Sequence, residues 1–106
     1  MAELRYSVAA RGDLEAIGEY ILGQLHNPSA ALRVIRMIHQ EIDRLRTFPE
    51  MGPRLDSLSP AKELRYLVCG KYLAFYETDG DTVYIDRILY GRRNYAALLF
   101  DLDEEP

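Results

Sequence analysis

The sequence has little of several residue types that mark particular classes of protein. Among its 106 residues there is one cysteine, Cys69, and no tryptophan. A single cysteine excludes an intramolecular disulfide, and it suits a reducing compartment. Nothing around Cys69 marks it as an activated nucleophile, so we expect a semi-buried strand residue that acts as a small hydrophobe.

Long apolar segments are also missing. No apolar run approaches the ~20 residues that a membrane-spanning helix needs. The N-terminal residues 1–5 (MAELR) contain no apolar signal region. These absences predict a soluble, cytoplasmic protein with no membrane partner.

The chain has no excess of positive charge. Its net charge is −4, and four of its acids, Asp101, Asp103, Glu104 and Glu105, lie at the C-terminus. The acids and bases of the remaining chain balance, so we interpret 101–106 as an acidic, solvated tail. Because phosphate neutralisation dominates nucleic-acid affinity, this balance argues against broad nucleic-acid binding but leaves room for a small basic site.

Metal and cofactor patterns are absent from the sequence. The two histidines, His26 and His39, have no cysteine or histidine at ligand spacing beside them. Glycines 12, 18 and 23 are dispersed and do not form a phosphate-binding loop. We therefore predict no metal and no cofactor, and we expect neither histidine to be catalytic.

The N-terminal half shows a change of hydrophobic period. Alternation of apolar and polar residues predicts a strand over residues 3–8, and helical spacing then predicts a helix over 11–25. Asn27 followed by proline is typical of a helix start, and it predicts a second helix over 28–46. Because the connection is very short, the two helices should form an antiparallel hairpin.

The C-terminal half reads as a meander of strands. Prolines, glycine and serines predict a loop over 47–63. Strands are predicted over residues 64–68, 72–77 and 82–89, with turns at Gly70-Lys71 and Asp79-Gly80, followed by a short tail over 95–102. The prediction is one α+β domain, residues 1–106, in which a two-helix hairpin packs on a small antiparallel sheet in the order β-α-α-β-β-β plus a C-terminal tail. With two helices, the other sheet face should stay partly open.

These elements, with the residues at their turning points, resemble the RelE/ParE toxin superfamily from about Tyr6 to Phe100. The matching segments are 13–17, 20–21, Asn27-Pro28, Ala30-Ala31, Leu45, Phe48-Pro49, Gly52-Pro53, Arg65, Val68, Gly70, Tyr72, Phe75-Tyr76, 83–85, 87–89 and Gly91-Arg92. Each segment alone is common, but their order and spacing together are fairly specific.

The resemblance implies the toxin of a type II toxin–antitoxin pair, which arrests growth when it is free of its cognate antitoxin. An antitoxin typically lays a helix or an extended segment across such a toxin. Two activities are implied. RelE-like members cut mRNA in the ribosomal A site, whereas ParE-like members poison DNA gyrase and are not known as nucleases. A third hypothesis is an inactive module that only binds its partner.

The nuclease hypothesis names specific catalytic residues. RNA cleavage by a 2′-hydroxyl needs a proton acceptor, a proton donor and cations that stabilise charge on the phosphate. Arg65 matches the arginine on the family's first meander strand. Arg92 or Arg93 with Tyr95 resembles the arginine-plus-tyrosine pair of RelE-like nucleases. These four residues are the catalytic candidates if the chain is a nuclease.

Three further side chains are candidates for binding a partner or substrate. Arg87, Tyr76 and Tyr90 lie on the predicted meander. Arginine and tyrosine are both enriched at protein interfaces. The structural alternative for Arg87, and for Arg65, is an ion pair with Asp86 or Glu77 or a contact that holds the C-terminal tail. The alternative for the tyrosines is packing with solvated hydroxyls.

Departures from the nuclease pattern favour the gyrase-directed activity. Many relatives have a histidine where this chain has Tyr90, and a phenol is a poor base near neutral pH because its reference pKa is about 10. The loop over 47–63 has Arg54 and Lys62 as its only bases, where strong RelE-like nucleases have a lysine-rich loop. We therefore favour gyrase over the ribosome and mRNA as the target.

Overall fold

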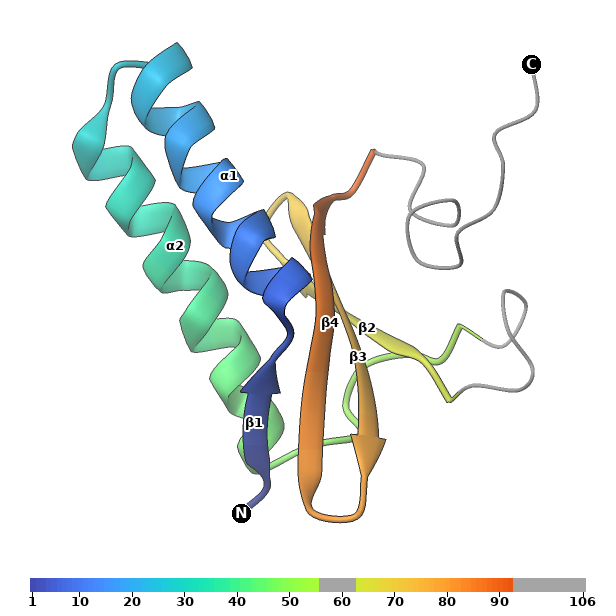
Figure 1. Cartoon of the computed structure of the whole chain (residues 1–106). Coiled ribbons are helices and arrows are strands. Elements are labelled where there is room, and N and C mark those ends of the chain that lie inside the picture. Colours follow the sequence, from blue (N-terminus) through green and yellow to red (C-terminus); the bar gives the residue numbers. More distant parts are fainter. Residues whose placement is uncertain (56–62, 93–106) are drawn as a thin grey trace, which may run out of the picture.

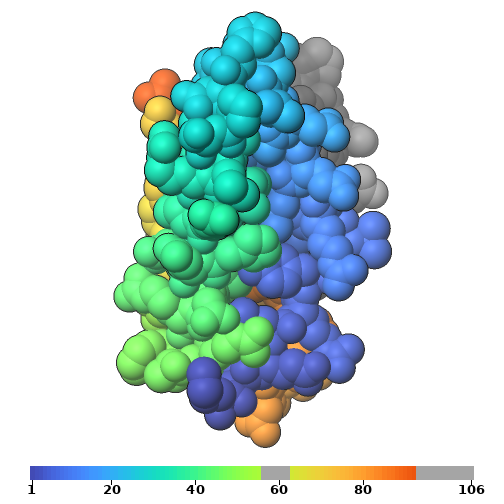
Figure 2. All heavy atoms as spheres, turned by 90° about the vertical axis from the view of Figure 1, so that its left-hand side faces the viewer, coloured from blue at the N-terminus to red at the C-terminus, as the bar shows by residue number. Residues whose placement is uncertain are grey.

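The computed structural model describes residues 1–55 and 63–92 of the chain. In this part, a helical hairpin covers one face of a four-stranded sheet (Figures 1 and 2). The elements are β1 (Glu3–Tyr6), α1 (Val8–Gln24), α2 (Pro28–Asp43), a 3-10 turn η1 (Arg44–Arg46), β2 (Arg65–Cys69), β3 (Tyr72–Asp79) and β4 (Thr82–Tyr90). The predicted α+β class and the element order β-α-α-β-β-β are confirmed. The predicted tail over 95–102 lies outside the described residues.

The sheet is mixed, which corrects the prediction of an antiparallel sheet at one pair of strands. The strand order is β1-β4-β3-β2, and β1 pairs with β4 in parallel, with Leu4 opposite Val83. The helical hairpin and the following loop return the chain so that β2 runs in the same sense as β1 (Figure 1). Successive antiparallel pairs then give β4 that same direction, so its pairing with β1 must be parallel.

The two helices begin at side-chain caps. The Ser7 hydroxyl accepts a hydrogen bond from the Ala10 amide at 2.9 Å, so α1 begins three residues before its predicted start. The Asn27 side-chain oxygen accepts from the Ala30 amide at 3.0 Å, and Pro28 is the first residue of α2, as predicted. The last predicted turn of this helix is the 3-10 turn η1.

The meander turns where the glycines predict. Gly70 and Gly80 have φ values of 62° and 61°, in the left-handed region that glycine adopts without steric cost. A bulge between Phe75 and Tyr76 shifts the register of β3 against β4. This irregularity changes which β4 side chains point toward the helices. No residue in the sequence predicts it.

One hydrophobic core lies between the hairpin and the sheet. Its buried members are Ala10, Leu14, Ile38, Ile42, Leu45, Leu67, Cys69, Ala74, Tyr76, Val83, Ile85 and Ile88. Burial raises the pKa of the Cys69 thiol to about 12. The thiol therefore stays protonated at neutral pH, consistent with the predicted packing role. Neither of the described helices combines the length and apolar character that crossing a bilayer requires.

Candidate functional site

Arg65, a catalytic candidate, holds the loop that follows α2. Its Nη1 donates to the carbonyl oxygens of Glu50 at 3.1 Å and Gly52 at 2.8 Å. Its Nη2 lies 3.8 Å from a carboxylate oxygen of Glu63, and its side chain is 14% exposed. Most of this guanidinium is therefore turned toward its own chain, which leaves little of it to receive a phosphate.

Tyr76, predicted on a binding face, is a core residue. Its side chain has no exposed surface, and its hydroxyl accepts a hydrogen bond from the Gly52 amide at 2.9 Å. Burial raises the pKa of this phenol, so it stays neutral. In the described structure Tyr76 therefore cannot contact a partner, contrary to the prediction, and instead anchors the same loop that Arg65 holds.

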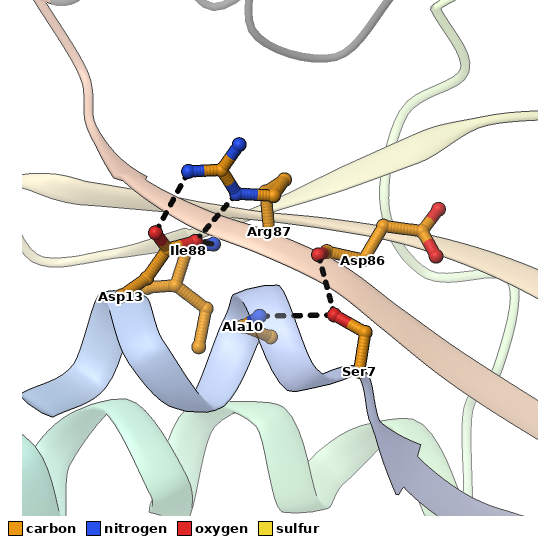
Figure 3. A network of polar contacts seen from close by, with 6 residues as sticks. All are labelled: Ser7, Ala10, Asp13, Asp86, Arg87 and Ile88. Atoms are coloured by element: carbon orange, nitrogen blue, oxygen red, sulfur yellow. Dashed lines mark hydrogen bonds and ion pairs between the residues drawn. The ribbon is translucent and has the colours of Figure 1, made fainter.

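Arg87 is engaged by Asp13 of α1. Its Nε and Nη2 donate to the two carboxylate oxygens of Asp13, each at 2.8 Å, and the Ile88 amide donates to the same carboxylate at 2.9 Å (Figure 3). The two side chains are 24% and 12% exposed, and the hydrogen bond to Asp13 raises the pKa of Arg87. The predicted ion-pair partners were Asp86 and Glu77; the bidentate partner comes from a helix instead.

The Asp13 contact belongs to a longer seam between α1 and the edge of β4. β1 pairs with β4 only as far as Ile85. Beyond that point the Ser7 amide donates to the Ile85 carbonyl at 3.0 Å, and the Ser7 hydroxyl donates to the Asp86 carbonyl at 2.7 Å (Figure 3). Asp13 then accepts from Ile88, so polar groups of Ser7 and α1 continue the hydrogen bonding that β1 begins.

A groove of about 750 Å³ lies between the sheet and the end of the hairpin at which α1 connects to α2. Its described lining comes from both helices, the β2–β3 turn and the end of β4: Asp13, Ala16, Ile17, Tyr20, Ile21, Leu25, Ala30, Val34, Met37, Gly70, Lys71, Tyr72, Ile88, Leu89 and Tyr90. Most of these side chains are apolar. A groove of this size and chemistry suits an apolar segment of a partner.

Tyrosines gather at this groove. Tyr90, a predicted binding residue, is 39% exposed, and its ring meets that of Tyr72 edge to face with centroids 5.9 Å apart. Tyr20 of α1 lines the same groove and is 59% exposed. The sequence analysis proposed Tyr90 but did not single out Tyr20 or Lys71, because only the packing of α1 over the sheet brings these three residues to one groove.

The remaining candidates lie at the end of β4 or beyond it. Arg92 is exposed, and the Gly91 amide beside it donates to the Lys71 carbonyl at 3.0 Å. Arg93 and Tyr95 lie outside the described residues. His39, expected to be non-catalytic, has its Nδ1 3.1 Å from the Tyr6 hydroxyl on the helix-covered side of the sheet. In residues 1–55 and 63–92 no group of acids, histidines and cysteine has an arrangement fit to hold a metal ion.

Comparisons with known proteins agree with this architecture. Residues 4–95 match the family described as the ParE toxin of the type II toxin–antitoxin system parDE. A solved chain of the chromosomal ParDE system from P. aeruginosa is similar at 25% sequence identity and a TM-score of 0.72, over 85% of this chain and 96% of that one. No curated protein sequence matches at a significant level. Since the family match spans most of the sequence, the chain belongs to the ParE toxin family, and it is the toxin of a type II toxin–antitoxin system.

Proposed function

We propose that this toxin arrests growth by inhibiting DNA gyrase, and that it acts by binding rather than by cutting RNA. The observation that carries the proposal is the engagement of Arg65 and Arg87. Both guanidinium groups make short hydrogen bonds within the chain. A nuclease would need such cations facing the scissile phosphate.

Tyr76 and Tyr90 also fit a binding function better than a catalytic one. Tyr76 is buried, so its phenol cannot reach a substrate. Tyr90 lines a groove that is mostly apolar, and the other phenols among its described lining residues are Tyr20 and Tyr72. Such surroundings suit contacts with a protein partner more than proton transfer to RNA.

The test compares the two targets directly. Purified toxin is added to DNA gyrase, relaxed plasmid and ATP, and in parallel to a translation extract programmed with a reporter mRNA. We expect supercoiling to stop while the mRNA stays intact, and premixing with antitoxin to restore supercoiling. Cleaved mRNA with normal supercoiling would overturn the proposal in favour of a ribosome-dependent nuclease. If folded toxin changed neither supercoiling nor the mRNA, the result would favour the third hypothesis, an inactive module that only binds its partner.

Membership in a type II system implies an antitoxin partner, and we place that partner in the groove. The groove is open at the hairpin tip, where apolar side chains of α1, α2 and β4 face one another. An amphipathic helix binds such a groove through apolar residues three and four positions apart. Its burial there removes apolar surface from water, which is the main source of affinity in such contacts.

Two leucines test this placement because they differ in position but have similar exposure. Leu25 lines the groove and is 60% exposed, whereas Leu32 is 52% exposed and is not among the groove-lining residues. We expect Leu25→Asp to weaken antitoxin binding by about 2–3 kcal/mol, because a carboxylate would be buried against apolar surface. Leu32→Asp should bind normally. Titration calorimetry of the two variants measures the difference, and equal affinities would place the antitoxin elsewhere.

A further inference from the structure

The polar side chains of the groove gather where the β2–β3 turn meets the end of β4. Tyr72 follows the turn directly, and Tyr90 lies opposite it in the β3–β4 register. Lys71, in the turn itself, is exposed, and its carbonyl is tied to the chain after β4 by the Gly91 amide. Tyr20 reaches the same groove from α1. We call these four groove-lining residues, Tyr20, Lys71, Tyr72 and Tyr90, the rim.

The rim offers hydrogen-bond donors and positive charge. A lysine ammonium has three donors and no acceptor, and a neutral phenol can donate one hydrogen bond. Burial raises the pKa of Tyr72, and the neighbouring Tyr90 and Tyr20 raise it further. The Tyr72 hydroxyl therefore keeps its proton at neutral pH and remains a donor.

Within residues 1–55 and 63–92, the groove supplies no free carboxylate to this rim. Among the described lining residues the one carboxylate is Asp13, and it already accepts three hydrogen bonds, from Arg87 and the Ile88 amide. An apolar segment that covered the rim without an acceptor would desolvate these donors and leave them unpaired, which is costly. The occupant must therefore bring an acceptor, and a negatively charged one matches Lys71 best.

We propose that the antitoxin segment in the groove carries an aspartate or glutamate whose carboxylate is bound by Lys71 and the hydroxyls of Tyr72 and its neighbours. The apolar floor supplies affinity, and the rim selects the register in which the segment binds. This inference rests on the proposed placement of the antitoxin in the groove. It adds the chemistry that distinguishes the cognate segment from any other amphipathic helix.

The experiment uses the whole toxin chain and its cognate antitoxin. Lys71→Met and Tyr72→Phe remove the charge and the hydroxyl while they keep the apolar bulk. We expect each to weaken binding about tenfold, and Lys71→Met to reduce the dependence of affinity on salt. Matched controls outside the groove lining are Arg36→Met on α2 and Tyr84→Phe on β4, both expected to bind normally.

A double-mutant cycle identifies the acid. Each aspartate and glutamate of the antitoxin is replaced by its amide and combined with Lys71→Met. One of them should show effects that are not additive, which marks the residue that contacts the lysine. Additive effects for every acid would overturn the proposal. A second result would also overturn it. If a toxin truncated after Phe100 bound the antitoxin more tightly, and Lys71→Met no longer changed the affinity of that truncated toxin, the anion at the rim would be the chain's own acidic tail.

The two proposals fail differently. If Leu25→Asp leaves antitoxin binding intact, the groove is not the antitoxin site and both proposals fall. If Leu25→Asp abolishes binding while Lys71→Met and Tyr72→Phe bind as the wild type does, the groove assignment stands. The carboxylate anchor alone is then wrong.

Discussion

Replacing Gly52 with alanine is expected to lower the free energy of unfolding by about 3–5 kcal/mol, the sum of overpacking and a lost buried hydrogen bond. A Cβ at this position would overlap the carbonyl oxygen of Tyr66 and lie 2.8 Å from the Tyr76 hydroxyl. The obstacle includes backbone of β2, so it cannot rotate away as a flexible side chain would. The Gly52 amide would also lose its bond to Tyr76. A domain of this size has roughly 5–15 kcal/mol of stability, so the loss threatens the fold itself.

Urea unfolding followed by circular dichroism measures this effect. Gly12→Ala is the matched control, because a Cβ at Gly12 in α1 meets nothing within 4 Å. Alanine has the higher helix propensity, so this control should raise stability by roughly 0.5–1 kcal/mol. If Gly52→Ala unfolded at the wild-type urea concentration, the loop after α2 would not be packed against the sheet as described.

Removing the Asp13 carboxylate is expected to cost about 3 kcal/mol, because it leaves a mostly buried charge and a backbone amide without their acceptor. Asp13→Ala would release the Nε and Nη2 donors of Arg87 and the amide of Ile88. Loss of one side chain thus breaks three hydrogen bonds between α1 and β4. The groove should also change shape, since Asp13, Ile88 and their neighbours line it.

A thermodynamic cycle separates the ion pair from the backbone contact. Arg87→Ala removes the charge but leaves Asp13 bonded to Ile88, so it should destabilise less than Asp13→Ala. In the double variant the two losses should not add, and the difference is the energy of the Asp13–Arg87 pair. Thermal unfolding of the four proteins gives the result. Strict additivity would show that the pair contributes nothing in solution.

Local sequence signals predicted most of the secondary structure. Asn27-Pro28 begins α2 as expected, and the turns at Gly70 and Asp79-Gly80 divide the meander as expected. These features depend on residues close together in the chain, where capping and turn chemistry act directly. The start of α1 was missed because Ser7, its cap, stands at the end of an alternating stretch that reads as strand.

The candidate site was predicted less well because its contacts join distant segments. Arg87 bonds to a residue 74 positions away, and Tyr76 to one 24 positions away. An exposed, partner-binding arginine and a paired, structural one look alike in a single sequence. The parallel direction of β1 has the same origin, since it depends on how the whole chain returns to the sheet.

The pairing of β1 with β4, the last strand of the sheet, also determines when the toxin can fold during synthesis. Ser7 and Asp86 are in contact across 79 residues, and β4 lies between β1 and β3 in the strand order. During synthesis on the ribosome, the first strand must wait unpaired until the last strand emerges, because the sheet's inner strand is made near the end. Such long-range pairing also slows folding. A stalled or truncated chain that ends before Thr82 should therefore be unfolded and harmless, and the cell faces a poison only once translation is nearly complete.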